Sequence, residues 1–100
     1  MNIPVASVKD LPPGSMMGVE AQGEAILLAN VQGRYYAIGD ICTHMGCNLS
    51  EGTLTGENVE CSCHSAVFDL RTGAVLRGSA SLPERMFEVN VENGEITISL

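Results

Sequence analysis

The sequence has no tryptophan and only four aromatic residues among its 100 positions. A core built from this chain must therefore rest mainly on valine, isoleucine, leucine and methionine. Cations are also scarce, with five lysines and arginines against twelve aspartates and glutamates and a formal net charge of −7. An acidic chain repels phosphates, which argues against nucleic acid as a partner. The charge is compatible with solubility alone or with docking onto a basic protein surface.

Long apolar segments are missing as well. The longest candidate, 25–31, has the length of a strand, whereas a membrane-spanning helix needs about 18 or more apolar residues. The first residues carry neither a basic stretch nor the apolar run of an export signal. We therefore expect a cytoplasmic protein without a membrane partner. One hundred residues correspond to a single domain.

No stretch repeats its apolar residues with a helical period. Apolar segments instead alternate with turn residues about every ten positions, and Asn93-Gly94 is typical of a tight hairpin. The expected strands cover 3–8, 16–21, 24–30, 34–38, 53–55, 58–60, 66–69, 74–76, 86–91 and 95–100. The pattern predicts an all-β fold, with a sandwich or barrel base from about 1–39 and 79–100 and a loop-rich insert at 40–78.

Cysteine and histidine are absent from all positions outside 42–64. Inside this stretch stand Cys42-Thr-His44-Met-Gly-Cys47 and Cys61-Ser-Cys63-His64. Each half offers thiolates and an imidazole within one loop, and the chain between the halves is long enough for a hairpin. Where thiols are kept reduced, such a cluster indicates metal ligands or redox groups rather than a disulfide framework. Zinc and an iron–sulfur cluster both remain possible at this point.

The two motifs, with Leu49-Ser-Glu-Gly52, Phe68-Asp69 and Thr72-Gly73, resemble the Rieske iron–sulfur family over about residues 40–78. The resemblance implies an antiparallel β fold in which 40–78 form the cluster-binding subdomain. It implies one [2Fe–2S] cluster per chain, with two ligands on each iron. The implied ligands are Cys42 and Cys61 on one iron and His44 and His64 on the other. A zinc site would leave the Phe-Asp…Gly continuation without a role.

Cys47 and Cys63 remain after the ligands are assigned. Matching cysteines in high-potential Rieske proteins form a disulfide, so the resemblance implies a Cys47–Cys63 disulfide shielded by the cluster loops; the alternative is two buried thiols. The same relatives carry Ser and Tyr donors to cluster sulfur where this chain has Ala66 and Phe68. Ser65 stands one position early for that role. We therefore expect a potential in the low-to-middle part of the Rieske range, which spans about −150 to +300 mV.

Further residues are expected around the cluster. Gly46 and Gly52 are expected to supply a positive φ angle or room for backbone N–H groups. Met45 is expected at an apolar rim, and Pro83, in the loop 78–83, is expected to cover the cluster. Asp40 and Glu51 flank the first loop and are each expected on a solvated face.

The resemblance implies a one-electron carrier of the ferredoxin type, not an enzyme. Its partners would be a reductase and an oxygenase or other acceptor, which dock transiently on a monomer. One alternative in the same class is the small subunit of an assimilatory nitrite reductase. Alternatives from other classes are a zinc-bound structural or interaction module and a redox sensor working through Cys47 and Cys63.

Overall fold

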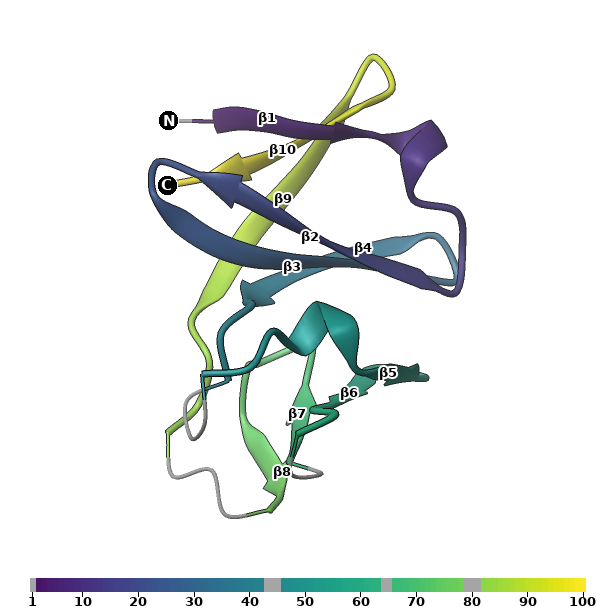
Figure 1. The fold of residues 1–100 in the computed structure, drawn as a ribbon. Coiled ribbons are helices and arrows are strands. Elements are labelled where there is room, and N and C mark those ends of the chain that lie inside the picture. Colours follow the sequence, from purple (N-terminus) through teal and green to yellow (C-terminus); the bar gives the residue numbers. More distant parts are fainter. Residues whose placement is uncertain (1, 43–45, 64–65, 79–81) are drawn as a thin grey trace.

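The computed structural model describes residues 2–42, 46–63, 66–78 and 82–100, which form two antiparallel sheets (Figure 1). The larger sheet has six strands in the order β1-β10-β9-β4-β3-β2. Its strands are β1 (Asn2–Ser7), β2 (Ser15–Ala21), β3 (Glu24–Val31), β4 (Arg34–Gly39), β9 (Met86–Glu92) and β10 (Glu95–Ser99). The outer strands β1 and β2 also contact each other, so the sheet curls toward a barrel. The all-β, antiparallel prediction is confirmed.

Two-residue turns set the register of this sheet. Gln22-Gly23, Gln32-Gly33 and Asn93-Gly94 each have positive φ at both residues, the backbone of the tight hairpin turns that match strand twist. Each joins two neighbouring strands, β2–β3, β3–β4 and β9–β10. The sequence pattern predicted the Asn93-Gly94 hairpin, and the other two turns fall in the gaps between the expected strands.

The smaller sheet has the order β5-β6-β7-β8. Its strands are β5 (Thr53–Thr55), β6 (Asn58–Glu60), β7 (Val67–Asp69) and β8 (Val75–Arg77). The predicted hairpin around Gly56 is present, with Thr55 opposite Asn58. Two single-turn 3₁₀ helices that the sequence pattern did not predict are η1 (Val8–Asp10) and η2 (Leu49–Glu51). Figure 1 shows η2 between the two sheets.

The strand β3 is buried on both faces, which explains its nearly continuous apolar sequence. Ile26 and Leu28 point into the core of the six-stranded sheet, whereas Leu27 and Ala29 belong to a second core. That second core lies between the sheets and contains Phe68, Leu49 and both of the cysteines outside the disulfide. This second core therefore joins the insert to the base.

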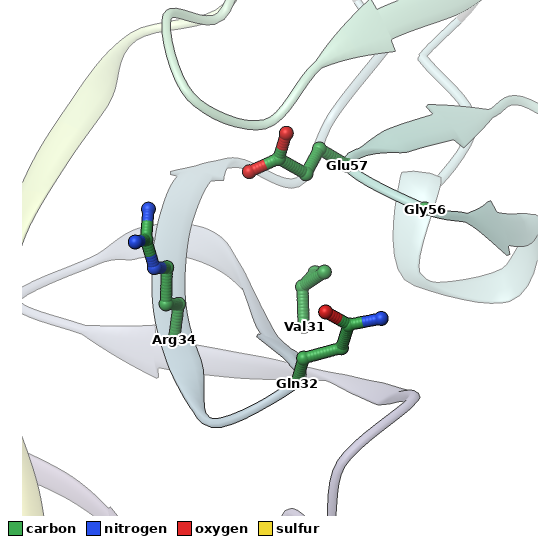
Figure 2. A pocket seen from close by; sticks show the side chains of 5 residues that line it. All are labelled: Val31, Gln32, Arg34, Gly56 and Glu57. Carbon is green, nitrogen blue, oxygen red and sulfur yellow. The ribbon is translucent and has the colours of Figure 1, made fainter.

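A polar contact also joins the two sheets. The Tyr36 hydroxyl on β4 donates a 2.8 Å hydrogen bond to the Glu57 carboxylate in the β5–β6 turn. Beside it lies a surface hollow of about 430 Å³, lined by Val31, Gln32, Arg34, Gly56 and Glu57 (Figure 2). Among the residues that the structure describes, none of the cysteines lines this hollow. Within the described residues, no helix has the length and apolar character needed to cross a membrane.

Candidate metal centre

The first loop of the candidate centre begins where β4 ends. The Cys42 N–H donates to the Cys47 carbonyl at 2.7 Å, and the Gly46 N–H donates to the Cys42 carbonyl at 3.0 Å. These two bonds close a tight loop, and Gly46 has the expected positive φ, +76°. Cys42 itself is 2% exposed. The loop therefore directs one buried sulfur into the core between the sheets.

The second loop connects β6 to β7. The Cys61 N–H donates to the Ala66 carbonyl at 2.8 Å across the loop, and Cys61 is 1% exposed. Cys42 and Cys61 thus lie in the same core although they are 19 positions apart. The other two predicted ligands, His44 and His64, lie outside the described residues, as do Met45 and Ser65.

A disulfide joins the two loops. Cys47 and Cys63 are bonded, with their Cα atoms 6.5 Å apart, as the resemblance implied. The expectation that the loops shield this bond is only partly right. Cys47 is half-buried but Cys63 is exposed, because Cys63 lies in the turn after Cys61 and not in a strand. One end of the disulfide is therefore open to solvent.

A third sulfur lies close to this disulfide. The sulfur atoms of Cys47, Cys61 and Cys63 are all within 4.8 Å of one another. Such a group of three could hold a metal ion if all three were thiolates. Two of them are bonded to each other, and it is the thiolate that serves as a metal ligand. Of these three residues, only Cys61 is left to bind a metal.

The donor set fits an iron–sulfur cluster at the described positions. Cys42 and Cys61 offer two buried sulfurs, one from each of two tied loops, and buried cysteine sulfurs are the soft ligands that such clusters use. The assignment of all four ligands stays a prediction, because both histidines lie outside the described residues.

Apolar side chains pack in the same core as the two cysteines. Ala66 and Phe68 are both fully buried and neither has a side-chain donor. Gly78 packs directly on Ala66, since a β-carbon at Gly78 would stand 2.7 Å from Ala66 Cα. Pro83 is exposed, and its role as a cover stays a prediction. Gly52 has no positive φ (−90°), but a β-carbon there would collide with the Glu60 carbonyl oxygen.

The prediction that Asp40 lies on a solvated face is wrong. Asp40 is 2% exposed, and its side chain accepts hydrogen bonds from Asn48 and Ser50. The sequence contained a partial signal, because Asp40 stands between Ile38 and Ile41 in an apolar segment. Donors eight and ten positions later satisfy its carboxylate, and no local pattern identifies them. Glu51 is exposed, as predicted.

A charged pair supports the turn after β7. Arg71 donates from Nε to Asp69 Oδ1 at 3.2 Å and from Nη2 to Oδ2 at 3.0 Å. This hydrogen bonding from the Arg71 side chain lowers the pKa of Asp69, and burial opposes it. Arg71 also lies 3.7 Å from Glu57, the partner of Tyr36. The pair therefore continues the polar connection between the two sheets.

Taken together, the fold and the two loops define a small antiparallel β protein built to hold a metal cluster between sulfur-bearing loops. Comparison with known proteins agrees. A family model for the Rieske [2Fe-2S] domain matches residues 1–91. The ferredoxin component of biphenyl 2,3-dioxygenase from Rhodococcus jostii (strain RHA1) is 40% identical over 96 residues, which cover 96% of this chain and 90% of that protein.

Solved structures give the same result. The ferredoxin of carbazole 1,9a-dioxygenase from Nocardioides aromaticivorans IC177 matches with a TM-score of 0.94 and 30% identity, over 99% of this chain and 97% of that one. The structure of a complex of reduced oxygenase and oxidized ferredoxin in carbazole 1,9a-dioxygenase contains a second match. Its TM-score is 0.92 and its identity 33%, over 98% of this chain and 92% of that one. The chain belongs to the Rieske [2Fe-2S] family and is a Rieske-type ferredoxin, a one-electron carrier with one [2Fe–2S] cluster and not a catalyst.

Proposed function

We propose that this ferredoxin carries single electrons from a reductase to the terminal oxygenase of a dioxygenase system. The proposed ligands are Cys42, His44, Cys61 and His64. When bound, the cluster accepts and releases one electron; the protein holds it, limits its contact with water and presents it to partners. The observation that carries the proposal is the pair of buried cysteines on two disulfide-tied loops, in a chain similar to dioxygenase ferredoxins along nearly its whole length.

The surface supports transient docking of protein partners. The net charge of −7 favours basic partner surfaces. Within the described residues, Arg71, Arg77 and Arg85 each lie against a carboxylate, so these cations are offset locally. Ile41, which directly precedes Cys42, is 45% exposed, and Leu82 is 61% exposed. An exposed apolar side chain next to Cys42 is suited to a small interface that forms and separates quickly.

The proposal also covers the division of the chain, its oligomeric state and its location in the cell. The base is assigned to about 1–39 and 79–100 and the cluster-binding subdomain to about 40–78. The six-stranded sheet contains β1 to β4, β9 and β10, whereas the four-stranded sheet contains β5 to β8, and this separation supports the division. A monomer in the cytoplasm is proposed because the relatives are ferredoxin components. Those relatives favour this function over a nitrite reductase subunit, a zinc module or a redox sensor.

The ligand set is tested by a pH-dependent redox titration of the visible spectrum. The loaded protein should be red-brown, and its potential should fall as pH rises, because imidazole N–H groups on the oxidised centre lose protons. Substituting any of the four proposed ligands with alanine should abolish the bands, whereas S62A, in the same loop as Cys61, should keep them. A colourless protein, or a potential independent of pH, would contradict the ligand set.

The partner class needs a separate measurement. The reductase and oxygenase of the Rhodococcus jostii biphenyl dioxygenase system are suitable probes, since the related ferredoxin comes from that system. With NADH and the reductase, the visible bands should bleach, and oxidised oxygenase should restore them. If the bands are intact but the reductase does not bleach them and the oxygenase does not restore them, the partner class is overturned for these probes. The cluster assignment would still stand.

A further inference from the structure

Asp40 forms a buried polar network at the start of the first loop. Asn48 Nδ2 donates to Asp40 Oδ2 at 3.0 Å, the Ser50 N–H donates to Oδ1 at 2.7 Å, and Ser50 Oγ donates to Oδ2 at 2.9 Å. Both carboxylate oxygens therefore have partners, although the residue is only 2% exposed. Three donors therefore hold the Asp40 carboxylate in one position.

The same residue ties the loop to the six-stranded sheet. The Asp40 N–H donates to the Ala25 carbonyl on β3 at 3.0 Å, and its own carbonyl accepts the Leu49 N–H at 2.6 Å. Gly18 on β2 provides the space, because a β-carbon there would stand 2.8 Å from Ser50 Oγ and 3.0 Å from Asp40 Oδ2. Segments far apart in the sequence thus converge on one carboxylate.

We propose that Asp40 is a positioning residue for the cluster that also sets its potential. Its hydrogen bonds fix the ends of the first loop, residues 41–50, and so place Cys42. Its buried negative charge opposes the electron that the reduced centre gains, and so holds the potential down. The inference rests on the proposed function, in which Cys42 is a cluster ligand.

Burial distinguishes Asp40 from Glu51, the acidic residue at the other end of this loop. A charge away from water is screened little by solvent and salt, so its effect on a nearby centre persists. Glu51 carries the same charge but is exposed, so water and salt screen it. Ser50 and Asn48 partly offset the charge of Asp40, because their donor dipoles point toward it. Removing a donor should therefore lower the reduction potential, whereas removing the charge should raise it.

The test compares three variants of the loaded protein by redox titration. D40N removes the charge and keeps the shape, since Asn48 can turn its amide to accept from the new side-chain nitrogen. We expect the ratio of reduced to oxidised protein at fixed potential to rise at least threefold, an upward shift of about 28 mV at 59 mV per tenfold for one electron. S50A keeps the charge and removes one donor, and should shift the potential downward. E51Q is the matched control and should shift it little, with no shift left at high salt.

The outcomes distinguish this inference from the proposed function. A wild-type protein without visible bands would contradict the function itself. A wild-type protein with bands, and a D40N protein with the same bands and an unchanged potential, would overturn the effect of the charge. If D40N does not retain the cluster, the S50A variant tests the effect of the charge instead. An unchanged or raised potential in S50A would also overturn that effect. For the positioning role, backbone amide exchange at residues 49 and 50 should be faster in S50A than in the wild type; unchanged exchange would overturn that role.

Discussion

Gly78 lies directly against Ala66. A β-carbon added to Gly78 would stand 2.7 Å from Ala66 Cα and 3.0 Å from Ala66 Cβ, and Gly78 also has a φ of +105°. The start of the 78–83 loop can therefore approach the second cysteine loop only because residue 78 has no side chain. Ala66 in turn accepts the Cys61 N–H bond that closes the second loop, so the contact reaches the candidate centre.

G78A should destabilise the protein by more than the backbone cost alone. A non-glycine residue with positive φ costs about 1–2 kcal/mol, and the clash with Ala66 adds to it. We expect a lower urea midpoint and a shorter lifetime of the visible bands. G56A is the matched control, since Gly56 also has positive φ (+58°) but nothing within 4 Å of the added carbon. If the urea midpoint falls equally in G78A and G56A, the contact with Ala66 contributes nothing to stability.

A66S should raise the reduction potential. Ala66 is fully buried and stands where high-potential Rieske proteins carry a serine donor to cluster sulfur, which favours the reduced state. A redox titration measures the shift, and A74S serves as the control for an added hydroxyl on the turn before β8. The wild-type potential should lie in the low-to-middle part of the Rieske range. A wild-type value near the top, or no change in A66S, would contradict this account of tuning.

Removing the disulfide should loosen the two loops. The bond closes a loop with a sequence separation of 16, for which chain entropy predicts about 3 kcal/mol of stabilisation. The double variant C47A/C63A is preferred because a single substitution would leave a thiol near Cys61. Urea unfolding of the loaded protein should show an earlier loss of the visible bands. The same midpoint with and without the bond would mean that other contacts align the loops.

The Asp69–Arg71 pair predicts a pH dependence of stability. Arg71 lowers the pKa of Asp69 in the folded protein, so the pair stabilises the fold at pH values above the unfolded pKa of about 3.9. This contribution is lost as pH falls through the lowered folded pKa. The difference in unfolding free energy between wild type and R71M should therefore be largest from about pH 5 to 7 and shrink below about pH 4.

Urea unfolding at several pH values measures that difference. R85M is the control for the loss of one cation, because Arg85 pairs with Glu24 on the six-stranded sheet, away from Asp69. A wild-type advantage over R71M that stays constant from pH 7 to pH 3 would mean that Arg71 acts through packing of its side chain.

The sequence alone determined the strands and the chemical character of the centre. Alternating apolar residues and dipeptides such as Asn93-Gly94 are local signals, and the hairpins they predicted have the positive φ angles that such turns need. Cysteine and histidine are confined to 42–64, so a candidate site could be proposed before the fold was known. The disulfide partners followed from family resemblance, and the structure pairs the same two residues.

Only the tertiary structure decided how the segments meet. The strand order, with β9 between β10 and β4, depends on contacts between distant parts of the chain. The burial of Asp40 is a clear case, because its donors come from Asn48 and Ser50 and its space comes from Gly18. A charged residue is read as exposed unless its partners are known, since an unpaired buried charge is too costly. The fold supplies those partners, which is why Asp40 is inside.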